Sequence, residues 1–399
     1  MVPAIVNAQG LQFPGGRGLT HLHTAWTLDK GTLTLHTNAT SYSKTILLRS
    51  GQNPASRQTF WNIQGAMGLN YASGNNVEFS ITNLLYQDSH LGGKGYKLPY
   101  ALTIGAKIGS FGSRRSHFKV GVLLESRIPL STGKNIPFEP YSGGNIEGGI
   151  TGLLSYTADL LIPEAGLNMH ANIGIWHNND VGASLTNIPA DNIFVRNSSR
   201  QLIWGYGMMI PTNRIDMALE IKGANFIVRP PVTAYSREDY IYLTPSLSIR
   251  PNNKLAFTAG FDIRLSKDVD LTRYVQDGTV LRAQNSDLPG LPDWRMRLNG
   301  KYYLTRKAPR EIEKPLFTRA EIEELEAGSG IANKMPMQDR LVREKRKTEI
   351  AEEELEKIRK DRKKMEDMLA RLRQILRYGK ETQSSKLTIK KEDQEEDDQ

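Results

Sequence analysis

The sequence predicts an all-β transmembrane protein, an antiparallel up-and-down β-barrel of about twelve strands, followed by an α-helical coiled-coil extension. Three observations predict this fold. Apolar and polar residues alternate along the first three hundred positions, short turns alternate with long connections, and each alternating segment has on the order of ten residues. A tilted strand of that length is what a bilayer crossing requires.

The composition excludes several other classes of protein. The chain has 399 residues, a formal net charge of +9 and no cysteine, so it has no disulfide framework, thiolate nucleophile or Cys-ligated metal centre. The mean hydropathy of −0.45 is too low for a polytopic helical membrane protein, and no run of about 20 apolar residues would span as a helix. A transmembrane barrel remains compatible with these values because every second strand residue faces a wet interior.

Residues 1–31 precede the first expected strand of the barrel. The segment Val6-Asn7-Ala8 resembles the small-residue end of a signal-peptide cleavage site, so residues 1–8 are interpreted as a possible signal-peptide remnant, with a plain N-terminal segment as the alternative. Residues 16–31 end in the turn Asp29-Lys30-Gly31. We expect them to form a periplasmic cover or a plug inside the barrel, with an extra strand pair as the alternative.

Residues 32–305 carry the alternating pattern of the predicted barrel. Phe118, Val120, Val122 and Leu124 alternate with positions that include Lys119 and Glu125. Burying so many ions in a dry core would cost several kcal/mol each unless they were well paired, whereas a hydrated lumen holds them without that penalty. We therefore expect the apolar faces to meet lipid and the charged residues to face the lumen: Lys107, Lys119, Glu125, Arg127, Glu220, Lys222, Asp262, Arg264, Arg295, Arg297 and Lys301.

The connections between these segments are sorted by length. Short turns rich in Gly, Asn and Pro are expected at 73–76, 112–116, 162–166, 212–214 and 251–253. Long connections are expected at 44–59, 88–99, 131–145, 178–200, 228–239 and 269–293. An even strand number with short turns at one end and long loops at the other is typical of outer-membrane barrels, whose short turns are periplasmic.

Residues 32–304 thus resemble the outer-membrane β-barrel proteins of Gram-negative bacteria, in the broad porin and OmpA-like class. The segment Trp294–Leu304 is similar to the aromatic-rich last strand of that class, but here a long extension follows it. The resemblance implies a location in the cell outer membrane, outer-membrane lipid as a partner and a cleaved signal peptide. Aromatic residues near expected strand ends fit the interfacial girdles of such barrels: Trp61, Tyr71, Tyr86, Tyr100, Tyr156, Trp176, Trp204, Tyr206, Tyr240, Tyr242, Trp294 and Tyr302.

The extension divides into a linker with a short helix at 306–337, a long coiled-coil helix at 338–379 and a disordered acidic tail at 380–399. The seam of the long helix follows a spacing of four and three, with Arg362 between Ile358 and Met365. Its apolar positions are Ala351, Leu355, Ile358, Met365, Leu369, Leu372 and Leu376. We expect this helix to lie in the periplasm and to bind a periplasmic protein, peptidoglycan or another copy of the chain. Nucleic acid is not expected, because no groove-reading motif accompanies the basic charge.

The sequence carries no catalytic or ligand-binding motif. It contains no H-E-x-x-H, G-x-S-x-G or P-loop. His21 and His23 are two residues apart and would need a third ligand to hold a metal ion, so we interpret them as part of a polar strand face. We therefore predict no catalytic residue, cofactor or metal site, and no enzyme.

The sequence is compatible with three functions. The main prediction is a membrane anchor or assembly subunit of a cell-envelope complex, acting through its periplasmic helix, because the long extension has no role in a simple pore. The alternative is a passive porin-like channel for small hydrophilic solutes. The second alternative is a soluble β-barrel binding protein.

Overall fold

A computed structural model describes residues 18–48, 56–90, 101–113, 116–130, 135, 138–159, 166–185, 193–212, 215–252, 254–267, 271–272, 275–276, 279–280, 290–305, 348, 351–352, 354–366 and 368–369. The chain divides into two compact units, residues Met1–Glu311 and Ile312–Gln399. The first unit contains the strands and the second contains a helix.

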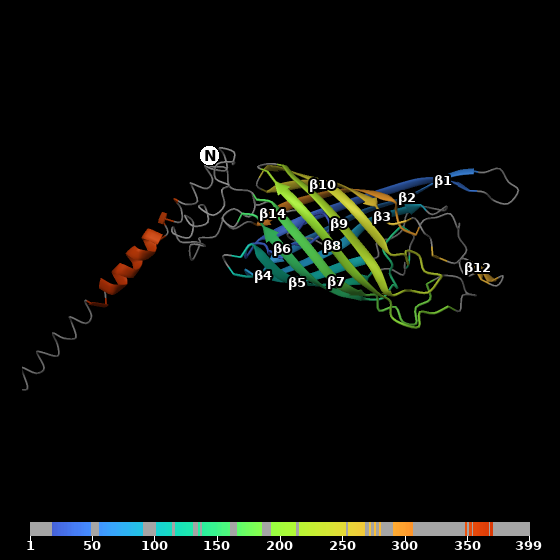
Figure 1. Cartoon of the computed structure of the whole chain (residues 1–399), viewed down its shortest axis with the longest axis horizontal. Coiled ribbons are helices and arrows are strands. Elements are labelled where there is room, and N and C mark those ends of the chain that lie inside the picture. The colour runs from blue at the N-terminus through green and yellow to red at the C-terminus, as the bar shows by residue number, and fades with distance from the viewer. Residues whose placement is uncertain are drawn as a thin grey trace, which may run out of the picture. The chain divides into compact units, whose positions relative to one another are not determined.

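The first unit is a closed antiparallel barrel of twelve strands (Figure 1), as the alternating pattern predicts. The barrel strands are β1 (Leu33–Leu48), β2 (Ser56–Ala72), β3 (Val77–His90), β4 (Ala101–Phe111), β5 (Phe118–Pro129), β6 (Glu147–Thr157), β7 (Asn168–His177), β8 (Arg200–Pro211), β9 (Ile215–Val228), β10 (Tyr240–Asn252), β11 (Leu255–Arg264) and β14 (Trp294–Thr305). Each pairs with its sequence neighbour, and β14 pairs with both β11 and β1 to close the ring. β12 (Val275–Gln276) and β13 (Thr279–Val280) form a separate two-stranded sheet.

The outer face of the barrel is apolar, as expected for a surface in contact with lipid. On β5 the outward side chains Phe118, Val120, Val122 and Leu124 are 52%, 49%, 42% and 49% exposed, while Leu123 between them is buried. The same alternation continues around the ring with exposed Ile, Leu, Phe and Met on other strands. A water-soluble barrel would bury such residues, since removing apolar surface from water stabilises it by about 25 cal/mol per Å². The distribution is therefore that of a barrel in a membrane.

The first connection of the barrel is shorter than the sequence suggests. We expected a long connection at 44–59, but β1 continues to Leu48 and β2 begins at Ser56, paired along their whole length. Polar and β-branched residues pair there, as in the 2.9 Å hydrogen bond between the hydroxyls of Thr45 and Thr59. The alternating pattern does not predict this part, because Ile46, Leu47 and Leu48 are consecutive apolar residues and mostly polar residues follow them, so apolar and polar positions do not alternate there.

Three aromatic residues assigned to the interfacial girdles lie inside the barrel instead. Tyr242 is fully buried, and the Arg295 guanidinium lies 5.0 Å from the centre of its ring. Tyr240 packs on Tyr242 with 5.4 Å between ring centres, and Trp176 lies 5.9 Å from the Arg127 guanidinium. Aromatic residues near strand ends are found on either face, so position along the strand alone does not select the outer one.

The second unit contains a helix that includes five of the seven predicted seam residues. Residues 348, 351–352, 354–366 and 368–369 are α-helical. Leu372, Leu376, the linker at 306–337 and the tail at 380–399 lie outside the described residues, as does the possible signal remnant at 1–8. The structure contains one copy of this helix and no helix paired with it among the described residues, so the coiled coil stays a prediction. In the described part of the chain, no helix is both long enough and apolar enough to cross a membrane.

Candidate functional site: the barrel lumen

All eleven charged residues assigned to the lumen lie on inward positions of their strands. Glu220, Asp262, Lys107, Arg297 and Lys301 are buried, and the other six are partly buried: Lys119, Glu125, Arg127, Lys222, Arg264 and Arg295. Arg295 and Arg297 contact Asp262 directly, whereas Lys119 lies away from this group. Lys119 lies near the turn of its hairpin, where its Nζ donates to the carbonyl of Ser113 at 2.8 Å.

Asp262 is the centre of the largest charged cluster. Its carboxylate lies 2.9 Å from Arg297 Nε and 3.3 Å from Arg295 Nε, and it accepts a hydrogen bond from Thr244 Oγ1 at 2.8 Å. Two guanidinium groups on one carboxylate leave the site positively charged overall. The excess positive charge stabilises the ionised carboxylate of Glu220 nearby, and it favours the neutral form of His21 over the charged form.

The second feature of the lumen is the N-terminal segment, which lies inside the barrel. We call residues 18–28 the plug segment. Glu220 Oε1 accepts the backbone N–H of Thr20 at 2.7 Å, and Glu220 Oε2 accepts those of His21 and Leu22 at 2.8 and 3.0 Å. Three charge-assisted hydrogen bonds to one buried carboxylate fix this stretch of backbone against β9.

His21 connects the plug segment to the Asp262 cluster. Its Nε2 lies 2.7 Å from Asp262 Oδ1 and its Nδ1 lies 2.8 Å from Lys222 Nζ. An ammonium group only donates, so Nδ1 accepts and Nε2–H donates, which is the neutral ring. Burial is the main cause that lowers the pKa of His21 well below its ordinary value, and Lys222 and Arg297 act in the same direction, while Asp262 opposes them.

The other half of the plug segment is bonded to the opposite wall. The N–H of Ala25 donates to Ser155 Oγ at 2.8 Å, and the carbonyl of Ala25 accepts the N–H of Ser110 at 2.7 Å. Farther along, the N–H of Leu28 donates to Glu78 Oε2 at 3.0 Å. The segment therefore crosses the bore from β9 and β11 to β3 and β4, and only its second half lies near the end with short turns.

Glycines in the wall make room for the plug segment. A Cβ atom at Gly205 would overlap the Leu22 side chain, and one at Gly109 would overlap the carbonyl oxygen of Ala25. Apolar contact is limited to small clusters, such as Leu19 and Leu22 with Met209. The plug segment thus depends mainly on hydrogen bonds to polar wall residues and on the space that wall glycines leave.

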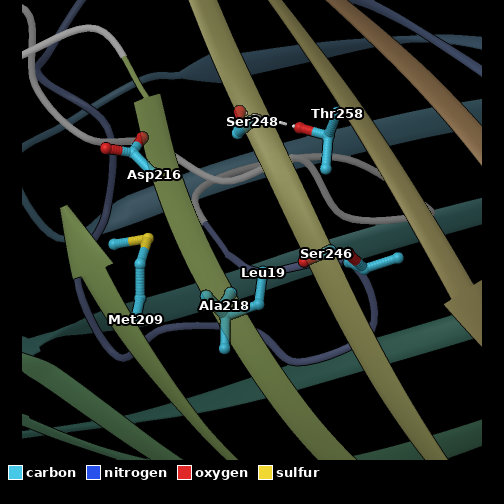
Figure 2. A pocket seen from close by; sticks show the side chains of 8 residues that line it. Leu19, Met209, Asp216, Ala218, Ser246, Ser248 and Thr258 are labelled. Carbon is cyan, nitrogen blue, oxygen red and sulfur yellow. Dashed lines mark hydrogen bonds between the residues drawn. The ribbon is translucent and has the colours of Figure 1, made fainter. Parts of the chain in front are cut away.

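A small cavity lies beside the plug segment. It has a volume of about 10 Å³ and is lined by Leu19, Met209, Ala218 and Ser246, whose side chains are drawn in Figure 2. That volume is what the centre of one water molecule needs. On the neighbouring strands, Thr258 Oγ1 donates to Ser248 Oγ at 2.9 Å (Figure 2). The plug segment and the wall are therefore in close contact around Leu19.

Loop residues enter the bore from the opposite end. Phe138 packs on Tyr42 of β1 with 5.2 Å between ring centres, and the Glu139 carboxylate accepts hydrogen bonds from the amides of Asn62 and Gln87. Arg127 Nε is 2.9 Å from Glu147 at the foot of this loop. A second cavity, of about 20 Å³, lies beside Phe138 and Arg295. The bore is therefore narrowed at both ends by polar contacts.

Neither His21 nor His23 lies on a strand face, contrary to our interpretation of the sequence. Both belong to the plug segment, and His23 Nε2 lies 3.6 Å from Glu125 across the lumen. Two histidines separated by one residue point to the same side of a strand and also of an extended segment that crosses a lumen. Their spacing therefore does not distinguish these two structures. The described residues contain no group of three His, Asp or Glu side chains arranged to hold a metal ion.

A serine–histidine pair lies at the loop end of the barrel, in addition to the buried pair in the lumen, where His170 Nδ1 lies 2.8 Å from Ser155 Oγ. His177 Nε2 lies 3.0 Å from Ser198 Oγ, and His177 Nδ1 accepts the N–H of Asn179 at 3.2 Å. Because Nδ1 accepts, Nε2 carries the proton, so the ring donates to the serine and is not a base for it. This geometry does not activate Ser198 as a nucleophile.

Comparisons with known proteins place no activity on the chain. No family model and no curated protein matches it. Similar solved structures include the NanC porin (10% identity, 68% of this chain and 100% of that chain, TM-score 0.41) and an outer membrane channel from Pseudomonas putida F1 (9% identity, 70% and 98%, TM-score 0.42). Another is the translocator domain of the autotransporter NalP from Neisseria meningitidis (8% identity, 69% and 89%, TM-score 0.34). At these TM-scores the matches assign no function.

Proposed function

We propose that the protein is an outer-membrane channel for small hydrophilic solutes whose bore is closed, in the form described here, by the plug segment. The observation that carries this proposal is the chemistry of the wall. Polar and charged residues line the lumen even where the plug segment covers them, including Glu78, Glu220 and Asp262.

A barrel that is filled permanently has no need of such a wall. Well-packed apolar residues replace buried ion pairs at no loss of stability, and often with a gain. A charged wall is stable in contact with water, however, so it suits a bore that fills with water when the plug segment leaves. The plug segment is bonded to the wall through hydrogen bonds that water can replace.

The location follows from the positions of the strand ends. Thr305 at the end of β14 donates through Oγ1 to the carbonyl of Gly31 at 3.1 Å, next to the start of β1. Both ends of the barrel therefore lie at the end with short turns. In outer-membrane barrels that end is periplasmic, so we infer a Gram-negative outer membrane, with the extension after Thr305 in the periplasm.

The test is to measure conductance in planar bilayers for a variant in which a new wall side chain occupies the space of the plug segment. In Gly109→Val a Cβ atom would overlap the backbone carbonyl oxygen of Ala25, so the plug segment itself has to move and we expect the fraction of time spent open to rise. The matched control is Gly152→Val on the outer face, where a Cβ meets only ordinary contact at 3.6 Å. We expect the control to stay as closed as the unchanged protein.

The channel proposal is wrong if Gly109→Val folds and inserts normally yet carries no current. Folding is checked by the resistance of the barrel to sodium dodecyl sulfate without heating. A folded, inserted and silent variant favours the second candidate function.

That second candidate is a membrane anchor or assembly subunit that acts through the helix. It is favoured by the closed bore and by the exposed apolar side chains of the helix, such as Leu355 and Ile358. Its test is the capture of cell-envelope proteins or peptidoglycan by the full chain. Leu355→Asp would lose a bound component that the unchanged chain retains, and Gly152→Val would not.

A further inference from the structure

The helix of the second unit carries an exposed apolar stripe. Leu355, Ile358, Met365 and Leu369 are 54%, 64%, 61% and 53% exposed, and they recur at spacings of three, seven and four along the helix. Such spacing places them on one side, while charged residues fill the other positions between Leu355 and Leu369 except for Met368. A helix with this much exposed apolar surface is stabilised mainly by covering it.

We propose that the stripe is a self-association surface that pairs with the helix of a second copy of this chain in a parallel, in-register coiled coil. The spacing assigns Leu355, Arg362 and Leu369 to heptad position a, and Ile358 and Met365 to position d. In a parallel pair each of these side chains lies opposite the same residue of the second copy.

The charges beside the stripe are complementary in this arrangement. Glu354 at position g lies opposite Arg359 at position e of the second copy. Arg362, the basic interruption at position a, packs next to Asp361 at position g of the second copy. The two symmetric Arg362–Asp361 contacts add a second carboxylate to the one that Glu366 already supplies to Arg362 within its own helix.

One pair of like charges opposes the association. Asp361 faces Glu366 of the second copy, at positions g and e. Arg362 Nε lies 2.9 Å from Glu366 Oε1 in its own chain, so in the pair Arg362 lies between both carboxylates and offsets their repulsion. A single buried polar residue at position a also fixes register, which favours the in-register arrangement over shifted ones.

Insertion in a membrane favours parallel over antiparallel pairing, and this step rests on the proposed location. Copies in one membrane share one orientation, and in every copy the helix follows the same strand end. The pairing itself rests on the stripe and its charges, so it does not depend on whether the bore conducts.

The test uses the absence of cysteine from the chain. Ile358→Cys places a thiol at position d, opposite the same thiol of the second copy, and we expect disulfide-linked dimers of the full-length protein under mild oxidation. Lys360→Cys lies on the outer face of the helix at position f and is the matched control. We expect it to cross-link at least tenfold less.

A charge reversal tests the interface without removing apolar surface. Arg362→Glu places two carboxylates beside each other at both symmetric contacts, and we expect the association of the full-length protein in detergent to weaken roughly tenfold, as measured by native mass spectrometry. Combining Asp361→Arg with Arg362→Glu should restore it. Lys363→Glu, on the outer face, makes the same charge change and should have no effect.

Equal cross-linking at positions 358 and 360, or a monomeric mass of the unchanged protein at every concentration, would overturn the proposal. Retention of a different protein or of peptidoglycan by the stripe, with no dimer, would also overturn it. Conductance of the same preparations reports separately on the proposed channel.

Discussion

At the scale of single residues, Glu220 and His21 are the groups on which the closed form depends most. Glu220 accepts three consecutive backbone N–H groups of the plug segment. His21 bridges Asp262 and Lys222 as a neutral ring. Both are buried between the plug segment and the wall, where unpaired polar groups are costly. Removing either group is therefore expected to destabilise the closed form.

Replacing Glu220 with glutamine is expected to loosen the plug segment. The amide keeps one acceptor oxygen, but it lacks the charge and places two donors against the three N–H groups. The closed form should lose about 2 kcal/mol, which is roughly a thirtyfold change in the ratio of closed to open states. Single-channel recordings measure that ratio. Glu147→Gln, at the other end of the bore beside Arg127, is the matched control.

Acidification is expected to open the bore through His21. Burial lowers the pKa of His21 in the closed form, while a displaced, hydrated ring has a pKa of about 6.5. The displaced form therefore binds more protons below pH ~6.5. The closed form is fully stable above that pH and loses up to about 1.4 kcal/mol per pH unit below it.

The groups that face His21 are Asp262 on β11, Lys222 and Glu220 on β9 and Arg297 on β14. In His21→Gln the ring is absent, so the open fraction should change much less between pH 8 and pH 5 than in the unchanged protein. Recordings at both pH values that give parallel profiles for the two proteins would show that another group is responsible.

At the scale of elements, each strand has two chemically different faces that serve different surroundings. On β5, Val122 faces outward and pairs with Ile108 of β4 and Gly152 of β6, whereas Leu123 faces the plug segment, where it packs with Ala25. Lipid, which excludes charge, determines the residue types on the outer face. The plug segment and water determine those on the inner face.

A charge at the middle of the outer face is therefore expected to destabilise the barrel. Val122→Arg should lower the free energy of unfolding from lipid vesicles by about 2–4 kcal/mol, because the guanidinium lies near the bilayer midplane. Leu130→Arg, just after the end of β5, should cost about 0–1 kcal/mol. Urea titrations followed by tryptophan fluorescence measure both. Equal losses would contradict the assignment of the outer face to lipid.

At the scale of the whole molecule, the barrel closes through its own strand pairs and does not need the plug segment. β14 pairs with β1 along nine residue pairs from Leu33–Thr305 to Ser41–Met296. The plug segment adds contacts to the wall but no strand to the ring. The two parts should therefore be separable.

A chain that begins at Gly31 is expected to keep the sheet and to lose the closed state. Circular dichroism should show the same strand content, and recordings in planar bilayers should show a pore that stays open. The free energy of unfolding should fall, because the wall loses the hydrogen bonds of six plug N–H groups: Thr20, His21, Leu22, Ala25, Thr27 and Leu28. A shortened chain that folds and remains silent would contradict the channel.

The sequence by itself determined the barrel, a number of about twelve strands and the face occupied by the alternating aliphatic and charged residues. Period-two alternation is a local property of consecutive residues, and lipid on one side makes it strict, so Val122 and Lys119 could be assigned without coordinates. The pattern gave the wrong structure where apolar and polar residues do not alternate, as around Thr45, and for Tyr242, His21 and His23, whose surroundings depend on residues distant in the sequence.

Only the tertiary structure decided what fills the bore. The contact between Glu220 and Thr20 joins residues 200 positions apart, and the space for Leu22 depends on Gly205 in a distant strand. No local pattern encodes such a pairing, because it arises from closure of the ring, which brings every inward side chain towards one axis. The same two histidines are therefore ordinary polar residues in the sequence and part of a closed lumen in the fold.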